Sequence, residues 1–245
     1  MDITVPKLEF ELDEREHGGI PVIVAAAGKS ARMQGTDKQL LELSGIPVLI
    51  RTLKAFEHSA AVSRIILVTR EEIIAEIQLL CRKYMITKLS DIVVGGNDRH
   101  SSVMRGIERL SENEDRVLIH DGARPFVTQK MISDCSAALE TNDGAVCAVK
   151  INDTVKRSSD GKLIETTLDR SLLYAAQTPQ GVRISAYRSA IEKIGGAACF
   201  TDDSSVLEAA GYSVALVEGD TSNIKITTPS DIRLAQALLE GETFL

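Results

Sequence analysis

An unbroken apolar run at residues 20–27, IPVIVAAA, constrains the fold of this chain more than any other feature. A strand with one solvated face alternates apolar and polar residues, whereas a strand covered on both faces is apolar throughout. Residues 64–69 form a second β-branched apolar segment, and residues 71–84 then place apolar side chains on one helical stripe. Strand and helix patterns keep alternating, which predicts an α/β, Rossmann-like fold: an open, mainly parallel sheet with helices on both faces.

The remaining elements follow the same alternation, with one interruption. Further strands are expected at 92–94, 117–119, 145–149 and 214–217, a further core segment at 224–227, and helices at 47–58, 101–110, 129–139 and 229–239. Residues 152–170 are polar and centred on the turn dipeptide Asp160-Gly161, which predicts a projecting β-arm. We therefore expect a charge-rich N-terminal extension at 1–19, one domain at 20–240 that includes the arm, and a short tail at 241–245.

Composition excludes several classes of function. The net charge of −7 argues against nucleic acid as a partner, because phosphate backbones reward a basic surface. The longest apolar run is far shorter than the ~20 residues of a membrane helix, and no leader pattern opens the chain, so we expect a cytoplasmic protein without a membrane partner. The four cysteines and four histidines are scattered, which gives no support for a disulfide framework or a transition-metal site.

Ligands of such sheets bind at the carboxyl ends of the strands, which directs attention to the loop after residue 27. Small residues there adjoin Arg32 and Lys38, so backbone N–H groups could approach a nucleotide while the cations neutralise phosphate oxygens. Neither the P-loop pattern nor G-x-G-x-x-G fits, since Ile23, Ser30 and Met33 stand where glycines are required. Taken alone, the loop could equally be a tight turn with solvated cations.

Several short motifs follow one another along the chain: AAAGKSARM at 25–33 with Lys38, GGNDRHSSV at 95–103, HDGARP at 120–125, DTVK at 153–156, DR at 169–170, QTPQ at 177–180, TDD at 201–203 and NIKIT at 223–227. In this order they resemble the 2-C-methyl-D-erythritol 4-phosphate cytidylyltransferase family over about residues 20–240. The resemblance implies transfer of a cytidylyl group from CTP to a small phosphorylated polyol, in non-mevalonate isoprenoid precursor synthesis. It also implies Mg²⁺, for which another divalent cation can substitute, and a homodimer with interlocked arms.

The resemblance assigns roles residue by residue. The residues that enclose and read cytosine are Ala25, Ala26, Ala27, Gly28, Gly96, Asn97 and Ser102. Those that stabilise charge in the transition state are Arg32, Lys38 and Lys225, and those that hold the acceptor are Arg124, Thr154, Arg170 and Thr178. Asp121 is expected to contact the metal, although a carboxylate that caps the following turn is the alternative. Ser30 and Asn97 depart from the family pattern, which usually has glycine and often aspartate there.

Three other interpretations stay open. A ribitol 5-phosphate cytidylyltransferase would share the nucleotide motifs and differ in its acceptor contacts. A nicotinamide-dependent oxidoreductase is disfavoured by the missing dinucleotide fingerprint, and a non-catalytic nucleotide-binding regulator by the presence of both Arg32 and Lys38. Asp202 and Asp203 are expected to begin a helix, where negative charge offsets the helix dipole, rather than to act in catalysis.

Overall fold

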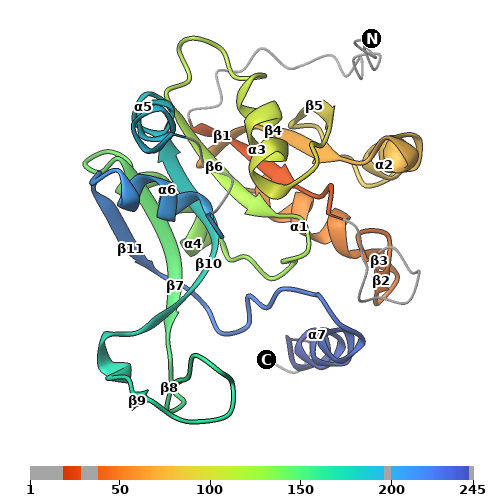
Figure 1. Cartoon of the computed structure of the whole chain (residues 1–245). Helices are drawn as coiled ribbons and strands as arrows, with labels where there is room; N and C mark the ends of the chain where they lie inside the picture. Colours follow the sequence, from red (N-terminus) through yellow and green to blue (C-terminus); the bar gives the residue numbers. More distant parts are fainter. Residues whose placement is uncertain (1–18, 29–37, 196–199, 243–245) are drawn as a thin grey trace.

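A computed structural model describes residues 19–28, 38–195 and 200–242. Its centre is a seven-stranded sheet in the order β11-β7-β10-β6-β1-β4-β5 (Figure 1). The strands are β1 (Ile20–Ala25), β4 (Val62–Thr69), β5 (Leu89–Val94), β6 (Arg116–Asp121), β7 (Gly144–Lys150), β10 (Tyr174–Arg183) and β11 (Val214–Glu218). Within this sheet only β10 runs antiparallel to its neighbours, β6 and β7. The predicted open, mainly parallel sheet is confirmed.

The apolar run at 20–27 owes its pattern to the position of β1 inside the sheet. Strand β1 pairs in parallel with β4 on one side and β6 on the other, and Val22, Ile23 and Val24 are completely buried. Val22 and Val24 belong to the core on one face of the sheet, whereas Ile23 belongs to the core on the opposite face. Successive side chains of a strand point to opposite faces, so only a strand covered on both sides needs every residue apolar.

Helices cover both faces. Helices α1 (Val48–Glu57), α2 (Ile74–Lys83) and α4 (Gln129–Ala138) pack on the first face, whereas α3 (Arg99–Ile107), α5 (Ile184–Ile194) and α6 (Asp203–Ala209) pack on the second. A third cluster joins α7 (Pro229–Glu242) to the small hairpin of β2 (Glu42–Leu43) and β3 (Ile46–Pro47). Helix α7 continues past residue 240, so the expected tail begins inside the helix. No helix of the described residues is both long and apolar enough to cross a membrane.

Two further details differ from, or refine, the sequence prediction. Residues 224–227 form no strand; instead the Ile226 N–H donates to the Ala123 carbonyl oxygen at 2.9 Å, which holds this segment against the loop that follows β6. The predicted arm is present: β8 (Lys156–Arg157) pairs with β9 (Thr166–Thr167), and Gly161 takes a positive φ of 69° at the turn. The arm projects from the lower end of the sheet in Figure 1, away from the helices.

Candidate functional site

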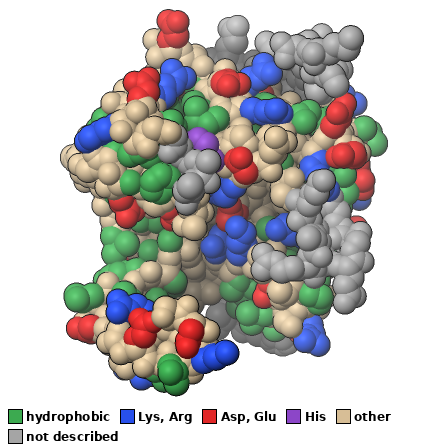
Figure 2. Space-filling model, in the orientation of Figure 1, with side chains coloured by type: hydrophobic (Ala, Val, Ile, Leu, Met, Phe, Trp, Pro, Cys, Tyr) green, Lys and Arg blue, Asp and Glu red, His purple; other side chains and the backbone are tan. Residues whose placement is uncertain are grey.

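A cavity of about 550 Å³ opens at the carboxyl ends of β1 and β6, beside the start of α3. Lys and Arg side chains gather near the middle of the face shown in Figure 2. The residues that line the cavity are Ala25, Ala27, Gly28, Lys38, Gln39, Gly96, Asn97, Asp98, Arg99, Ser102, Asp121, Ala123 and Lys225. Parallel strands end at the same edge of a sheet, which is why loops far apart in the sequence meet here.

One wall of the cavity is built from small residues in close contact. A Cβ placed on Gly95 would lie 2.2 Å from the Ala27 Cβ, so no side chain fits at this position. The Gly96 N–H donates to the Ser102 hydroxyl oxygen at 3.0 Å, and that hydroxyl donates to the Asp98 carbonyl at 2.7 Å. The loop before α3 is therefore held by its own hydrogen bonds.

Asp98 fixes the start of α3 itself. Its carboxylate accepts from the Ser101 N–H at 2.7 Å, while the Ser101 hydroxyl accepts from the Asp98 N–H at 3.1 Å, which is a capping box. The helix thus begins next to the cavity with its amide end facing the ligand space. The sequence departure at Asn97 lies just before this cap, where its side chain is exposed along the cavity wall.

The opposite wall carries Asp121 surrounded by cations. Its Oδ2 lies 2.7 Å from Lys225 Nζ and 3.6 Å from Arg124 Nε, and its Oδ1 lies 3.4 Å from Arg99 Nε. Burial alone would raise the pKa of this carboxyl, but Lys225, Arg99 and Arg124 together hold the pKa well below its ordinary value. Asp121 is therefore an ionised carboxylate throughout the physiological range.

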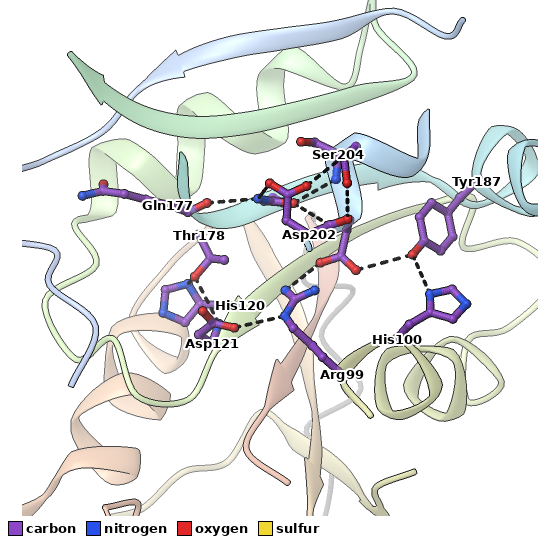
Figure 3. A network of polar contacts seen from close by, with 12 residues as sticks. Arg99, His100, His120, Asp121, Gln177, Thr178, Tyr187, Asp202 and Ser204 are labelled. Carbon is purple, nitrogen blue, oxygen red and sulfur yellow. Dashed lines mark hydrogen bonds and ion pairs between the residues drawn. The ribbon is translucent and has the colours of Figure 1, made fainter. Parts of the chain in front are cut away.

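His120 and Thr178 support Asp121 from behind (Figure 3). His120 is fully buried, and burial lowers its pKa from 6.5 to about 4, so the ring is neutral at pH 7. Its Nε2 faces the Arg124 carbonyl oxygen at 3.1 Å, which can only accept, so Nε2 carries the hydrogen. Nδ1 is then an acceptor for the Thr178 hydroxyl at 3.0 Å, and Thr178 Oγ1 accepts from the Asp121 N–H at 3.1 Å.

Arg99 and Asp203 belong to the same cluster, although the sequence analysis predicted neither as a site residue. Arg99 Nη2 lies 2.7 Å from Asp203 Oδ2, and the Asp203 side chain is only 2% exposed. The prediction that Asp202 and Asp203 begin a helix is confirmed, because Asp203 is the first residue of α6 and the Asp202 carboxylate accepts from the Ser205 N–H. Arg99 lies inside the motif GGNDRHSSV, but nothing in its spacing indicates that it would reach two carboxylates at once.

The structure brings most of the predicted site residues together. Those that line the cavity are Ala25, Ala27, Gly28, Gly96, Asn97, Ser102, Lys38, Lys225 and Asp121. Ala26 is buried behind this wall, and Arg124 and Thr178 lie behind Asp121. Thr154 and Arg170 are exposed on the arm and do not line the cavity of their own chain. Arg32 and Ser30 lie outside the described residues.

The donor set at Asp121 matches one kind of metal site. Among the residues that the structure describes, no three His, Cys, Asp or Glu side chains are grouped so as to hold a metal ion. Mg²⁺ commonly uses only one or two carboxylates and takes its other ligands from substrate phosphates and water. Asp121, a single ionised carboxylate at the cavity wall, is a donor of the kind that Mg²⁺ uses.

Comparison with known proteins gives one consistent family. The family model described as 2-C-methyl-D-erythritol 4-phosphate cytidylyltransferase matches residues 20–241. A protein of that name from Bacillus licheniformis is 43% identical over 223 residues, which cover 90% of this chain and 96% of the relative. The relative from Halalkalibacterium halodurans is 41% identical over 220 residues, with 89% and 96% covered.

Solved structures agree with the sequence comparisons. The 4-diphosphocytidyl-2C-methyl-D-erythritol synthase of Anaerococcus prevotii superposes with a TM-score of 0.80 at 32% identity and covers 91% of this chain and 97% of its own. The 2-C-methyl-D-erythritol 4-phosphate cytidylyltransferase of Thermus thermophilus gives a TM-score of 0.73 at 29% identity, with 91% and 99% covered.

Proposed function

The chain belongs to the 2-C-methyl-D-erythritol 4-phosphate cytidylyltransferase family, and from this premise we propose how its residues carry out the reaction. The enzyme joins CTP to 2-C-methyl-D-erythritol 4-phosphate, giving 4-diphosphocytidyl-2-C-methyl-D-erythritol and pyrophosphate, in isoprenoid precursor synthesis without mevalonate. The observation that carries this assignment is the family match over 20–241, which includes every strand of the sheet. The relatives are named for methylerythritol phosphate, so the ribitol 5-phosphate alternative is not favoured.

Binding of the nucleotide is the role of the small-residue wall. A pyrimidine ring fits against Ala27 and Gly96, with Ser102 as an acceptor because its own hydrogen is committed to the Asp98 carbonyl. Cytosine presents an amino donor where uracil presents a carbonyl oxygen, so an acceptor at this point favours CTP. Ala25, Ala26 and Gly28 complete this wall, and Asn97 closes its outer edge.

The chemical step needs charge stabilisation rather than a strong base. An oxygen of the acceptor phosphate forms a bond to the α-phosphorus of CTP, while the bond to the bridging oxygen breaks and pyrophosphate leaves with that electron pair. A phosphate monoester is mostly ionised at pH 7, because its second pKa is about 6. Lys38 and Lys225 line the cavity where negative charge develops, and we assign the same role to Arg32 by the family pattern.

Asp121 is the residue that would hold Mg²⁺, or another divalent cation in its place. The ion supplies charge neutralisation for the triphosphate and the leaving pyrophosphate when it is bound. We expect EDTA to abolish pyrophosphate release and added Mg²⁺ to restore it. Asp121→Asn should raise the Mg²⁺ concentration needed for the half-maximal rate; an unchanged Mg²⁺ dependence would remove Asp121 from the metal site.

By the family pattern we assign the acceptor site to Arg124 and Thr178 with two residues of the arm. The Thr178 hydroxyl is bonded to His120 and to the Asp121 N–H, so Thr178 supports Asp121 there rather than contacting the acceptor. Thr154 and Arg170 are exposed and distant from the cavity lining of their own chain, so we propose that they complete the site of a second copy in a homodimer. The arm also exposes the apolar side chains of Leu163 and Ile164, at 74% and 65% exposure, and Leu172 directly after the arm is 76% exposed. A two-stranded hairpin is marginally stable alone in water, so these side chains favour packing against a partner.

A panel of acceptors tests the overall reaction. The protein is incubated with CTP, Mg²⁺ and either methylerythritol phosphate or ribitol 5-phosphate, and pyrophosphate is measured while the cytidine product is identified by mass. We expect methylerythritol phosphate to be the better acceptor. A markedly higher rate with ribitol 5-phosphate would overturn the substrate assignment.

The net charge of −7 supports the absence of a nucleic-acid partner, and we place the reaction in the cytoplasm with its nucleotide substrate.

Mixed dimers test the shared site. Lys38→Ala and Arg170→Ala chains are unfolded and refolded together, and the mixed dimers are verified by mass. If Arg170 acts on the partner's site, each mixed dimer has one doubly damaged site and one intact site, so activity returns. The control pairs Lys38→Ala with Arg124→Ala, two residues of the same chain's site, and should recover nothing. Recovery in neither mixture would refute the shared site.

A further inference from the structure

Asp203 is buried to an extent that helix capping does not explain. The neighbouring Asp202 already caps α6, since its carboxylate accepts from the Ser205 N–H at 3.1 Å. The Asp203 carboxylate instead lies 2.7 Å from Arg99 and 3.4 Å from the Tyr187 hydroxyl, with 2% of its side chain exposed. Burial of an ionised carboxylate is costly unless a cation compensates it, so the position of Asp203 depends on Arg99.

Arg99 lies between two carboxylates and is closer to Asp203 than to Asp121. The distance is 2.7 Å to Asp203 and 3.4 Å to Asp121. Figure 3 shows Arg99 pointing toward Asp121. Burial alone would lower the pKa of Arg99, but the charges of Asp203 and Asp121 hold the pKa above its ordinary value. The remaining guanidinium nitrogen, Nη1, makes no hydrogen bond or ion pair within the described residues, and Arg99 lines the cavity.

Strand β10 anchors both Asp203 and Asp121. The N–H groups of Asp203 and Ser204 donate to Gln180 Oε1 at 3.0 and 2.9 Å, so β10 holds the start of α6. Two residues earlier on β10, Thr178 accepts from the Asp121 N–H. The backbones of Asp203 and Asp121 are therefore both anchored to β10 through the side chains of Gln180 and Thr178, and Arg99 spans the gap between the two carboxylates.

We propose that Asp203 is a positioning residue of the cytidylyl transfer. It draws the Arg99 guanidinium toward itself, so that the hydrogen bond from Arg99 Nε to Asp121 Oδ1 stays long, at 3.4 Å, and Asp121 Oδ1 and Arg99 Nη1 can both still reach the bound substrates. The proposal rests on the function proposed above. Without the Asp203 charge, Arg99 closes onto Asp121 Oδ1 while Lys225 already covers Oδ2, and the carboxylate is sealed by protein cations.

The sign of the charge change makes this role distinguishable from general damage to the fold. Asp203→Asn removes one negative charge from behind the wall of a cavity that binds a polyanion, so capture of CTP is not weakened. We expect KM for CTP to stay the same or fall, while kcat falls at least about 10-fold through misplacement of Arg99 and Asp121. A merely structural lesion raises KM as well.

The experiment measures kcat and KM for CTP and methylerythritol phosphate in Asp203→Asn, with Asp202→Asn as the matched control. Asp202→Asn removes the same charge one residue away and keeps an oxygen to cap α6, but Asp202 does not contact Arg99. The control should retain wild-type kcat. A wild-type kcat in Asp203→Asn, an equal fall in both variants, or a raised KM for CTP would overturn the proposal.

Arg99→Lys provides a second measurement, which also decides the matter if Asp203→Asn fails to fold. A lysine keeps the charge but presents one nitrogen, which cannot span two carboxylates as the guanidinium does. We expect a similar loss of kcat in Arg99→Lys. Adding Asp203→Asn to this variant should cause no further loss, because Asp203 acts through Arg99. Wild-type kcat in Arg99→Lys would overturn the proposal. A wild-type protein that releases no pyrophosphate overturns both this proposal and the function on which it rests.

Discussion

Removal of the Thr178 hydroxyl should destabilise the protein, because that hydroxyl serves two buried groups. Thr178 is 4% exposed; its oxygen accepts from the Asp121 N–H, and its hydrogen goes to His120 Nδ1. Thr178→Val keeps the shape of the side chain and leaves both groups unpaired. An unpaired buried polar group costs about 1–3 kcal/mol, and the added methyl offsets part of this, so we expect a net loss of about 2–4 kcal/mol.

Thr178→Ser is the matched control for that prediction. It retains the hydroxyl and deletes one methyl group, which costs about 1 kcal/mol. Urea unfolding followed by circular dichroism gives the free energy of unfolding of each variant, provided that the m-value is unchanged. The valine variant should unfold at a clearly lower urea concentration than the serine variant. Equal midpoints for the two variants would refute the assignment of the Thr178 hydroxyl to Asp121 and His120.

Three further predictions concern the same site. Lys38→Ala should lower kcat by about 10²-fold or more in a folded protein; an unchanged kcat would remove Lys38 from the mechanism. In the folded protein the pKa of His120 is lowered from 6.5 to about 4, so the unfolded chain binds the proton more tightly. The free energy of unfolding should therefore fall by up to about 3 kcal/mol as pH drops from 6.5 to 4. His120→Gln should show a shallower loss over that window, and an equal slope would contradict the assignment. Gly95→Ala should raise KM for CTP by about 10-fold, because its Cβ would meet the Ala27 Cβ at 2.2 Å. The control, Gly106→Ala, clashes with the core at Ile23 and should lower the stability of the fold without changing that KM.

The fold could be predicted from the sequence because burial on two faces leaves a distinct pattern. The run at 20–27 predicted a central strand, and β1 indeed has paired strands on both sides. The sequence analysis expected no strand at 174–183, where β10 lies. Its direction could not have been predicted either, since the period of a strand carries no information about whether its neighbours run parallel to it. Its reversal follows from the arm, which returns the chain beside β7.

The candidate site was predictable where a loop follows a strand, and much less so where a polar side chain is buried. Lys38, Ser102 and Asp121 line one cavity because their loops meet at the same edge of the sheet. The burial of Asp203 depends on Arg99, which is far away in the sequence and close only in the folded chain. Two adjacent aspartates before a helix look equivalent in the sequence, yet only Asp202 caps it.

The two carboxylates in the cationic cluster affect the binding of CTP and the rate of turnover differently. Arg99, Arg124 and Lys225 outnumber Asp121 and Asp203, so the wall is positive although the chain as a whole carries −7. Each carboxylate weakens the direct attraction for CTP, so we expect Asp203 to act by fixing Arg99, and Asp121 to act by holding the metal ion. Capture by the local field should weaken as salt rises, whereas the geometry that Asp203 and Asp121 impose is buried and screened much less. The KM for CTP should therefore depend on ionic strength more strongly than kcat does.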